Sequence, residues 1–189
     1  MLTRTQFKYV LYGALGIVGT ILLLLPRPLF RILWRFLDIF DSRMGSALRY
    51  ATLCKRLGAC GTNVYFGPFI YIDYPHHVYI GSNTSVQHGV TMLSLGGIEI
   101  GDQVSIAHGT SIVSGEHTWE DTSVSIRDNP VKLFPVRIGA DSWIGCGVRI
   151  LAGTSIGTHS VIAAGAVVKG THEPNSILAG VPAKKIRSL

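Results

Sequence analysis

Aliphatic residues recur at every sixth position over long stretches of this chain. Ile or Val stands at 138, 144, 150, 156, 162 and 168, with small and polar residues between these positions. The same spacing is found at Ile80, Val86 and Met92, and again at Ile100, Ile106 and Ile112. A six-residue period is neither that of a helix nor that of an ordinary strand. It indicates a solenoid whose repeating unit is one short strand and one corner.

Three hexads would close a triangular coil of eighteen residues, and the sequence shows this longer interval. The dipeptide Ile-Gly stands at 80–81, 100–101, 138–139 and 156–157, which are eighteen residues apart once two insertions are removed. A glycine falls at one place of the second hexad in every coil, at positions 89, 109, 147 and 165. We therefore expect four regular coils with aliphatic residues filling the axis of a prism. Val64 and Ile70 fit an earlier, irregular coil.

The larger insertion follows Ile112 and predicts a loop over 113–135 that leaves the prism. Long loops on a regular scaffold are often functional. This one holds His117, Trp119, Glu120 and Asp121, whereas the predicted prism walls carry almost no charge.

The first 45 residues have a different pattern, which predicts two helices. Residues 9–25 contain no charged side chain, and as a helix they would be about 25 Å long. That length is slightly less than the ~30 Å hydrocarbon core of a bilayer. Prolines at 26 and 28 should break the helix. A second helix over 29–42 would carry a polar stripe on an otherwise apolar surface, which is typical of a helix lying in a membrane interface. The predicted stripe consists of Arg27, Arg31, Arg35, Asp38 and Ser42.

These features give three predicted regions: a membrane-anchoring helical segment over 1–45, a linker over 46–62 and a β-helical domain over 63–189. The anchor would be a short span or a re-entrant dip, and a buried helical hairpin is the alternative. A cleaved signal peptide does not fit, because a second apolar helix follows instead of a small-residue cleavage site. Basic residues flank the apolar run, so we expect the inner (cytoplasmic) membrane with the β-helix facing the cytoplasm.

Composition narrows the classes of partner. The net charge is +6, and much of it lies near the N-terminus. No nucleic-acid-binding motif is present, so an anionic lipid or a phosphorylated ligand is the expected partner rather than DNA or RNA. The three cysteines match no zinc-site spacing and form no disulfide framework, which suits a reducing compartment.

Three stretches resemble the hexapeptide-repeat acyltransferases, and most closely their maltose, galactoside and polysaccharide O-acetyltransferases. They are IGDQVSIAHGTSIVSGEH, PVRIGADSWIGCGVRILAGTSIG and VIAAGAVVKGTHEPNSILAGVPAKKIR, and the resemblance covers about residues 64–189. It implies an all-β solenoid, namely a left-handed parallel β-helix with an extruded active-site loop. It also implies a homotrimer with acetyl-CoA as co-substrate and a sugar hydroxyl as acceptor. It says nothing about the N-terminal segment.

The resemblance assigns roles to individual residues. His117 would be the catalytic base, a role that suits an imidazole because this group exchanges a proton near neutral pH. Glu120 or Asp121, or else Glu116, could orient it. The residues expected to contact acetyl-CoA are Trp143 beside the thioester arm, Cys146 through its backbone N–H, Ala164 at the pantetheine, and Lys169, Lys184 and Arg187 near the phosphates. Lys169 is displaced by one position from the family's lysine. Gln87 falls where sugar acetyltransferases have asparagine, and with His88, His108 and Trp119 it would line the acceptor groove.

Two other functions remain open from sequence. His88 and His108 are one coil apart and should stack, as do some ligands of the zinc carbonic anhydrases built on this fold. Zinc needs three converging ligands, and that family's third histidine is missing, so no metal is expected. The other alternative is a β-helical scaffold without activity at the membrane. The sequence favours an O-acetyltransferase whose acceptor is a lipid-linked sugar or a surface polysaccharide, because an anchor concentrates the enzyme beside such a substrate.

Overall fold

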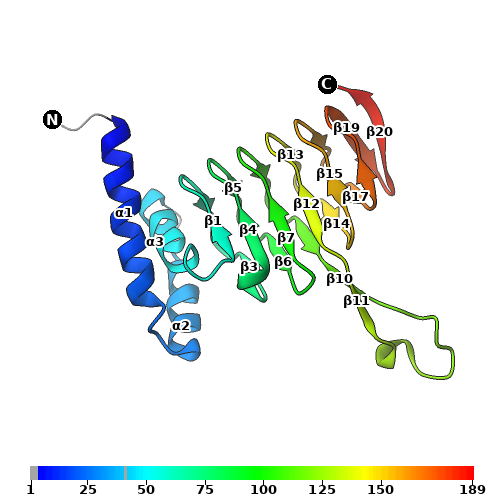
Figure 1. The fold of residues 1–189 in the computed structure, drawn as a ribbon, viewed down its shortest axis with the longest axis horizontal. Helices are drawn as coiled ribbons and strands as arrows, with labels where there is room; N and C mark the ends of the chain where they lie inside the picture. The colour runs from blue at the N-terminus through cyan, green and yellow to red at the C-terminus, as the bar shows by residue number, and fades with distance from the viewer. Residues whose placement is uncertain (1–3, 41) are drawn as a thin grey trace.

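The computed structural model describes residues 4–40 and 42–189, which form three helices followed by a β-solenoid (Figure 1). The helices are α1 (Arg4–Leu22), α2 (Arg27–Leu37) and α3 (Arg43–Leu53). The predicted break at the prolines is confirmed, since α1 ends before Pro26 and α2 begins after it.

The walls of the solenoid are three sheets, here called A, B and C, whose strands are all parallel except β20 at the end of sheet B. Sheet A consists of β1 (Ala59–Cys60), β4 (Val78–Ile80), β7 (Ile98–Ile100), β12 (Val136–Ile138), β15 (Ser155–Ile156) and β18 (Thr171–His172). Sheet B consists of β2 (Tyr65–Phe66), β5 (Ser85–Val86), β8 (Ser105–Ile106), β13 (Trp143–Ile144), β16 (Val161–Ile162), β19 (Ser176–Gly180) and β20 (Ala183–Ser188). Sheet C consists of β3 (Tyr71–Ile72), β6 (Thr91–Leu93), β9 (Ser111–Val113), β14 (Arg149–Ile150) and β17 (Val167–Val168).

The chain visits sheets A, B and C in turn, and the predicted parallel β-helix is confirmed. Each aliphatic residue of the period pairs in register with its equivalent one coil away, as Ile100 does with Ile138 and Ile106 does with Ile144. The stack has about six coils, of which the irregular coil containing Val64 and Ile70 is the first. Side chains at the sixth positions fill the axis, and Ile106, Ile144 and Ile162 are fully buried there. Removing this apolar surface from water is the main force that closes each coil.

The three corners of the prism differ in how they turn. Corner AB, between sheets A and B, uses a non-glycine residue with positive φ in every coil: Asn63, Asn83, Gln103, Asp141, His159 and Asn175. Corner BC, between sheets B and C, uses glycine with positive φ at 89, 109, 147 and 165, but Phe69 in the first coil. Corner CA, between sheets C and A, is irregular and includes the short helix η1 (Pro75–His77).

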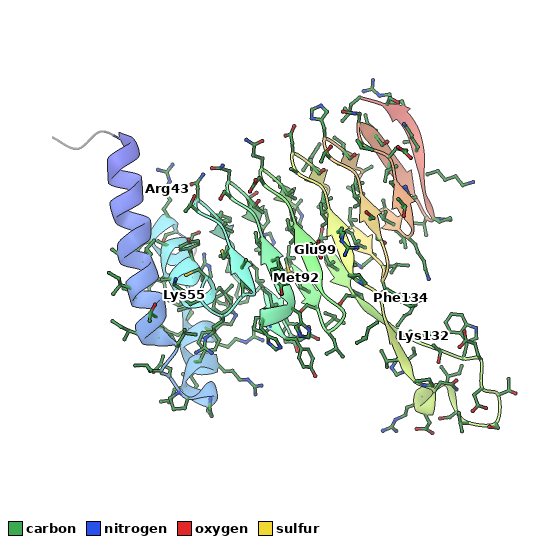
Figure 2. All side chains as sticks on the ribbon, viewed as in Figure 1. Arg43, Lys55, Met92, Glu99, Lys132 and Phe134 are labelled. Atoms are coloured by element: carbon green, nitrogen blue, oxygen red, sulfur yellow. The ribbon has the colours of Figure 1, made fainter. Side chains whose placement is uncertain are left out.

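The predicted extruded loop leaves the prism at corner CA and forms an antiparallel hairpin. Its strands are β10 (Gly115–His117) and β11 (Val131–Leu133), and η2 (Ile126–Asp128) lies near its tip. Figure 1 shows this hairpin projecting away from the walls, and Figure 2 places Phe134 at its base and Lys132 farther out. Phe134 N–H donates to the carbonyl of Ser114, which fixes where the loop returns.

Helix α3 begins at Arg43, crosses the predicted boundary at residue 45 and continues into the predicted linker over 46–62, where β1 also lies. Tyr50 and Leu53 of α3 and the following Leu57 belong to the same buried cluster as Val64 and Phe66 of the first coil. The helix therefore caps the open end of the prism. The hexad period does not reach this segment, so sequence patterning missed its packing role.

Buried Arg49 joins the helices to the solenoid. Its guanidinium donates to the carbonyl of Phe66 through Nε at 2.8 Å and to the carbonyls of Leu37 and Phe40 through Nη1 at 2.8 and 2.9 Å. Because a buried cation needs such partners, Arg49 fixes α2, α3 and the first coil relative to one another.

Helix α2 differs from the predicted interfacial helix at its C-terminal end. It ends at Leu37, and Asp38, predicted on the exposed polar stripe, is instead buried and accepts a hydrogen bond from Phe69 N–H at 2.7 Å. Ser42 caps α3 through Gly45 N–H. Arg31 and Arg35 are exposed, as predicted. Among the described residues, none of the helices has the length and apolar character needed to cross a bilayer.

Candidate active site

Corner BC brings together most of the residues that the sequence assigns to acetyl-CoA and the acceptor. Its backbone forms a ladder in which the glycine N–H of each coil donates to a carbonyl of the coil before it. The bonds are Gly89 to Pro68 at 3.0 Å, Gly109 to His88 at 3.1 Å, Gly147 to His108 at 3.0 Å and Gly165 to Cys146 at 2.8 Å. Pro68, His88, His108, Cys146 and Ala164 therefore form one column along this corner.

The two histidines of the column stack as predicted. The ring centroids of His88 and His108 are 5.0 Å apart and the rings are inclined by 1°. Both side chains are exposed, and half-buried Gln87 precedes His88 in the same coil. The three side chains offer a flat aromatic surface and polar groups at one edge of sheet B.

Lys184 borders the same corner, whereas Trp143 lies at the other end of sheet B, in line with Arg187 through Val161 and Ile177. Trp143 lies on the outer face of sheet B, exposed and in register with Ser105, three residues before Cys146. Lys184 pairs with Ala179 in the antiparallel β19–β20 hairpin, next to the sixth coil's BC turn. Arg187 pairs with Ile177 at the other end of the same strands, so it lies nearer corner AB.

Arg149 is a cation at corner BC that sequence reasoning missed. It lies on the outer face of sheet C, and its Nη1 donates to the carbonyls of Gly109 at 2.9 Å and Gly147 at 2.8 Å. The sequence could have indicated Arg149, because it is a charged residue in a predicted wall that is otherwise almost uncharged. Its positive charge lies beside the Cys146 turn.

The hairpin carries the predicted base. His117 is exposed at the outer end of β10, opposite Val131 of β11, and Trp119 is exposed two residues later. Within one chain, sheet C separates the hairpin from corner BC. The five residue steps from Gly109 to Ser114 correspond to about 16 Å at the rise of a strand.

The carboxylates expected to orient His117 have other partners in this chain. Glu120 forms an ion pair with Lys132, with an oxygen–nitrogen distance of 2.9 Å. Asp121 accepts hydrogen bonds from the hydroxyl of Ser123 at 2.6 Å and its N–H at 2.9 Å, and these bonds lower the pKa of the Asp121 carboxyl group.

Glu116 pairs with Lys169 at 3.1 Å. This contact ties the base of the hairpin to the end of β17, because Lys169 lies at corner CA. Lys169 is therefore not beside the column of Cys146 and Ala164, where the resemblance places a phosphate-binding lysine.

A buried asparagine, which sequence reasoning also missed, organises the hairpin tip. Asn129 donates through Nδ2 to the carbonyls of Asp121 at 3.0 Å and Ser125 at 3.1 Å, and its Oδ1 accepts from Asp121 N–H. Thr118, also buried, donates its hydroxyl to the carbonyl of Pro130 at 2.8 Å. These bonds give the tip a defined shape without a packed core.

The other two cysteines lie away from the corner. Burial raises the pKa of Cys54 and raises that of Cys60 to about 12, so both thiols are protonated at neutral pH. Across residues 4–40 and 42–189, no group of three or more His, Cys, Asp or Glu side chains has an arrangement that could hold a metal ion.

A shallow hollow in the surface lies over sheet A, away from corner BC. Its floor includes Tyr79, Ser155 and an exposed ion pair, in which Arg137 Nε is 3.1 Å from Glu99 Oε2. None of the predicted site residues lines it.

Comparison with known proteins agrees with this geometry. Residues 135–170 match the model of the bacterial transferase hexapeptide (six repeats). The galactoside O-acetyltransferase of Escherichia coli is 31% identical over 142 residues, which cover 75% of this chain and 68% of that protein. The chain belongs to the hexapeptide-repeat acetyltransferase family. A putative lipopolysaccharide biosynthesis O-acetyltransferase of E. coli is 28% identical over 182 residues, which cover 71% of this chain and 92% of that protein.

A solved structure extends the likeness to the ligand. The hexapeptide-repeat acetyltransferase of Vibrio cholerae complexed with acetyl coenzyme A superposes with a TM-score of 0.73 at 29% identity, covering 86% of this chain and 88% of that one.

The residues of corner BC fit that co-substrate. A Cβ added at Gly109, Gly147 or Gly165 would meet no atom within 4 Å, so the outer side of the column is open. An extended pantetheine arm can lie against such a backbone. Lys184 at the C-terminal end of the column supplies positive charge for phosphates.

Proposed function

We propose that this protein is an O-acetyltransferase that moves the acetyl group of acetyl-CoA to a hydroxyl of a sugar, with His117 as general base. The observation that carries the proposal is the open backbone column of corner BC, with stacked His88 and His108 on it and Lys184 at its end. The named activities of the E. coli relatives support the choice of a sugar hydroxyl.

The reaction needs a base, an oxyanion donor and a place for both substrates. The acceptor hydroxyl oxygen attacks the thioester carbon while the imidazole of His117 takes the hydroxyl proton. The backbone N–H of Cys146 donates to the oxyanion, as preorganised amides do in acyl transfer. Collapse breaks the carbon–sulfur bond, and the imidazolium returns the proton to the CoA thiolate. The products are the sugar ester and free CoA.

The site is incomplete in one chain. His117 projects from corner CA, whereas Cys146 lies at corner BC on the other side of sheet C. A neighbouring copy whose hairpin reaches this chain's corner BC would bring the two together. A closed ring of three such heterologous contacts gives the homotrimer that the family resemblance implies.

Complementation between inactive variants tests this arrangement. His117→Ala removes the base, and Ala164→Trp blocks the arm site while leaving His117 in place. Mixed trimers of the two variants contain interfaces with an intact hairpin and an intact corner, so we expect activity to return on mixing. The measurement is CoA release from acetyl-CoA in the presence of galactoside and lipopolysaccharide-sugar acceptors. Mixtures as inactive as their components would rule out a site shared between copies.

The acceptor is proposed to be a lipid-linked sugar or a surface polysaccharide at the cytoplasmic face of the inner membrane. The described residues between 13 and 48 expose many large apolar side chains, including Leu24 at 83% exposure, Ile39 at 73% and Met44 at 68%. Arg31, Arg35 and Arg43 are exposed beside them. Apolar side chains next to arginines suit an interfacial contact with anionic lipids.

Vesicle flotation tests the membrane contact. The full-length protein should float with vesicles containing phosphatidylglycerol and much less with phosphatidylcholine alone. The double variant Ile32→Asp/Ile39→Asp should reduce flotation while leaving acetyl-CoA affinity unchanged, because these exposed side chains lie at the helical end of the molecule, coils away from the turns of Cys146 and Ala164. Equal flotation of the parent and the variant would contradict the contact.

A further inference from the structure

Phe69 is an exception to the pattern of corner BC. The corresponding turn residue is glycine at 89, 109, 147 and 165, but in the first coil it is Phe69, with φ of 57°. A bulky side chain in the left-handed region is a genuine outlier. Its ring does not compensate by packing inside, since Phe69 is 60% exposed. A strained, exposed aromatic residue where glycine serves elsewhere points to a role at the surface.

Helix α2 holds this turn in place. Buried Asp38 accepts the Phe69 N–H, and the Nε1 of Trp34 donates to the carbonyl of Ile70 at 3.3 Å. Asp38 also pairs with Arg35 at 3.5 Å, and the side chain of Arg35 is 65% exposed. The carboxylate of Asp38 thus contacts both the backbone of Phe69 and the exposed guanidinium of Arg35.

Phe69 continues the column of the proposed active site. Gly89 N–H bonds the carbonyl of Pro68, so the first coil stacks directly on the coil of His88. At about 4.8 Å per coil, the first coil is roughly 14 Å from that of Cys146. A sugar placed on His88 and His108 beside the thioester would therefore direct its remaining substituent toward Phe69 and Arg35.

Charge indicates the nature of that substituent. Residues 1–58 contain nine Lys and Arg against two Asp, whereas residues 59–189 contain eight Lys and Arg against nine Asp and Glu. The helical end of the column is thus strongly basic and the solenoid nearly neutral. Such an end favours an anion.

We propose that Phe69 and Arg35 form an acceptor subsite for an apolar, anionic group attached to the sugar, of the kind found in an alkyl or polyprenyl phosphate. This inference rests on the proposed function, because it extends the acceptor side of the same corner. The phenyl ring packs on the first carbons of the chain, and Arg35 faces the phosphate.

Binding of decyl phosphate, below its micellar concentration, to the full-length protein tests the subsite by calorimetry. Phe69→Asn removes the ring but keeps a residue that tolerates positive φ, as Asn83 does at corner AB. We expect saturable binding that is weakened about tenfold by Phe69→Asn, the effect of losing part of one aromatic contact. Phe69→Tyr should retain the affinity, and added NaCl should weaken it.

Tyr79→Ala is the matched control, because Tyr79 is 47% exposed on the outer face of sheet A. Its affinity for decyl phosphate should equal that of the parent, and inorganic phosphate alone should bind far more weakly. Parental affinity in Phe69→Asn, an equal loss in Tyr79→Ala, or no saturable binding to the parent would each overturn the proposal. So would a Phe69→Asn variant that loses only vesicle binding, since the ring would then contact the bilayer instead.

A second measurement separates this subsite from the proposed function. Acetyl-CoA affinity should be unchanged in all Phe69 variants. If acetyl-CoA binds and turnover depends on His117 while decyl phosphate does not bind, the subsite fails and the acetyltransferase assignment stands. If acetyl-CoA does not bind to the parent protein, the assignment itself fails. The Tm of Phe69→Asn should equal or exceed that of the parent, because strain is removed and little surface is exposed; a large fall would show a packing role and overturn the proposal.

Discussion

Two corners of one prism have been put to different uses. Corner BC repeats the same turn coil after coil, and its backbone ladder and glycines form an open, even surface. Corner CA is interrupted, and its largest interruption extends the hairpin that carries His117. The regular corner offers main-chain groups at fixed spacing, whereas the irregular corner offers a side chain at a distance from the wall. We infer that the repeat supplies binding and the interruption supplies chemistry.

The largest expected effect is on kcat, and it distinguishes a role of the His117 side chain from a role of the Cys146 backbone N–H. His117→Ala should lower kcat by about 10²–10⁴-fold, the usual contribution of a general base. Cys146→Ala should leave turnover near the parental level, because the proposed oxyanion donor there is the N–H. Steady-state CoA release measures both, and circular dichroism checks that each variant is folded. A severe loss in Cys146→Ala would mean that the thiol takes part and that the two corners do not divide the work in this way.

The free energy of unfolding should be sensitive to substitutions of glycine at corner BC. Gly145 lies so close to the next coil that an added Cβ would be 2.6 Å from the backbone nitrogen of Ala164 and 2.7 Å from the carbonyl oxygen of Ile162. Gly145→Ala must therefore push two coils apart, and we expect a cost of about 1–3 kcal/mol. Denaturant unfolding measures it. An unchanged midpoint would show that the coils can separate freely at this corner.

A smaller effect should arise at the neighbouring glycine, where space is open but φ is 66°. Gly147→Ala should cost about 1 kcal/mol, the penalty of placing a Cβ in the left-handed region. Gly147→Asn should recover part of this loss. The three midpoints, measured together, distinguish conformational strain from steric contact, since a purely steric cause would make asparagine worse than alanine.

The smallest expected effect is at the base of the hairpin. Glu116→Gln removes the exposed ion pair with Lys169, and we expect less than about 0.5 kcal/mol of destabilisation, reduced further at high salt. If the pair only orients the hairpin, kcat should change more than the unfolding midpoint. A midpoint that falls as far as in Gly145→Ala would place the hairpin within the cooperative fold.

The repeat could be predicted in detail because one residue type at one spacing serves one purpose. Ile106, Ile144 and their equivalents each fill the axis, so their period shows the coil, its length and its insertions. The stacking of His88 on His108 follows from the same count. The packing of α3 was missed because Tyr50 and Leu53 contact the end of the prism, where no repeat precedes them. The burial of Asp38 depends on one partner, the backbone of Phe69, and leaves no trace in a helical pattern.

The active site was predictable only in part, for a geometric reason. His88, His108, Cys146 and Ala164 meet on one corner because they share a place in the eighteen-residue coil, and Gln87 precedes that place by one residue. His117 and Lys169 lie at corner CA, on the other side of sheet C. This separation follows from the length of the strands of sheet C, and the residue types gave no sign of it. Arg149 and Phe69 were visible as exceptions, a charge on a bare wall and an aromatic residue in a glycine column.

Helix α3 packs on the start of the solenoid, and the antiparallel strand β20 extends sheet B at the finish. Sheets A and C end at β18 and β17, and the number of coils before these strands is free to vary. Adding or deleting one block of eighteen residues would change the length of the stack by about 4.8 Å. The number of coils thus sets the distance between the positions at which the outer ends of the two substrates can bind.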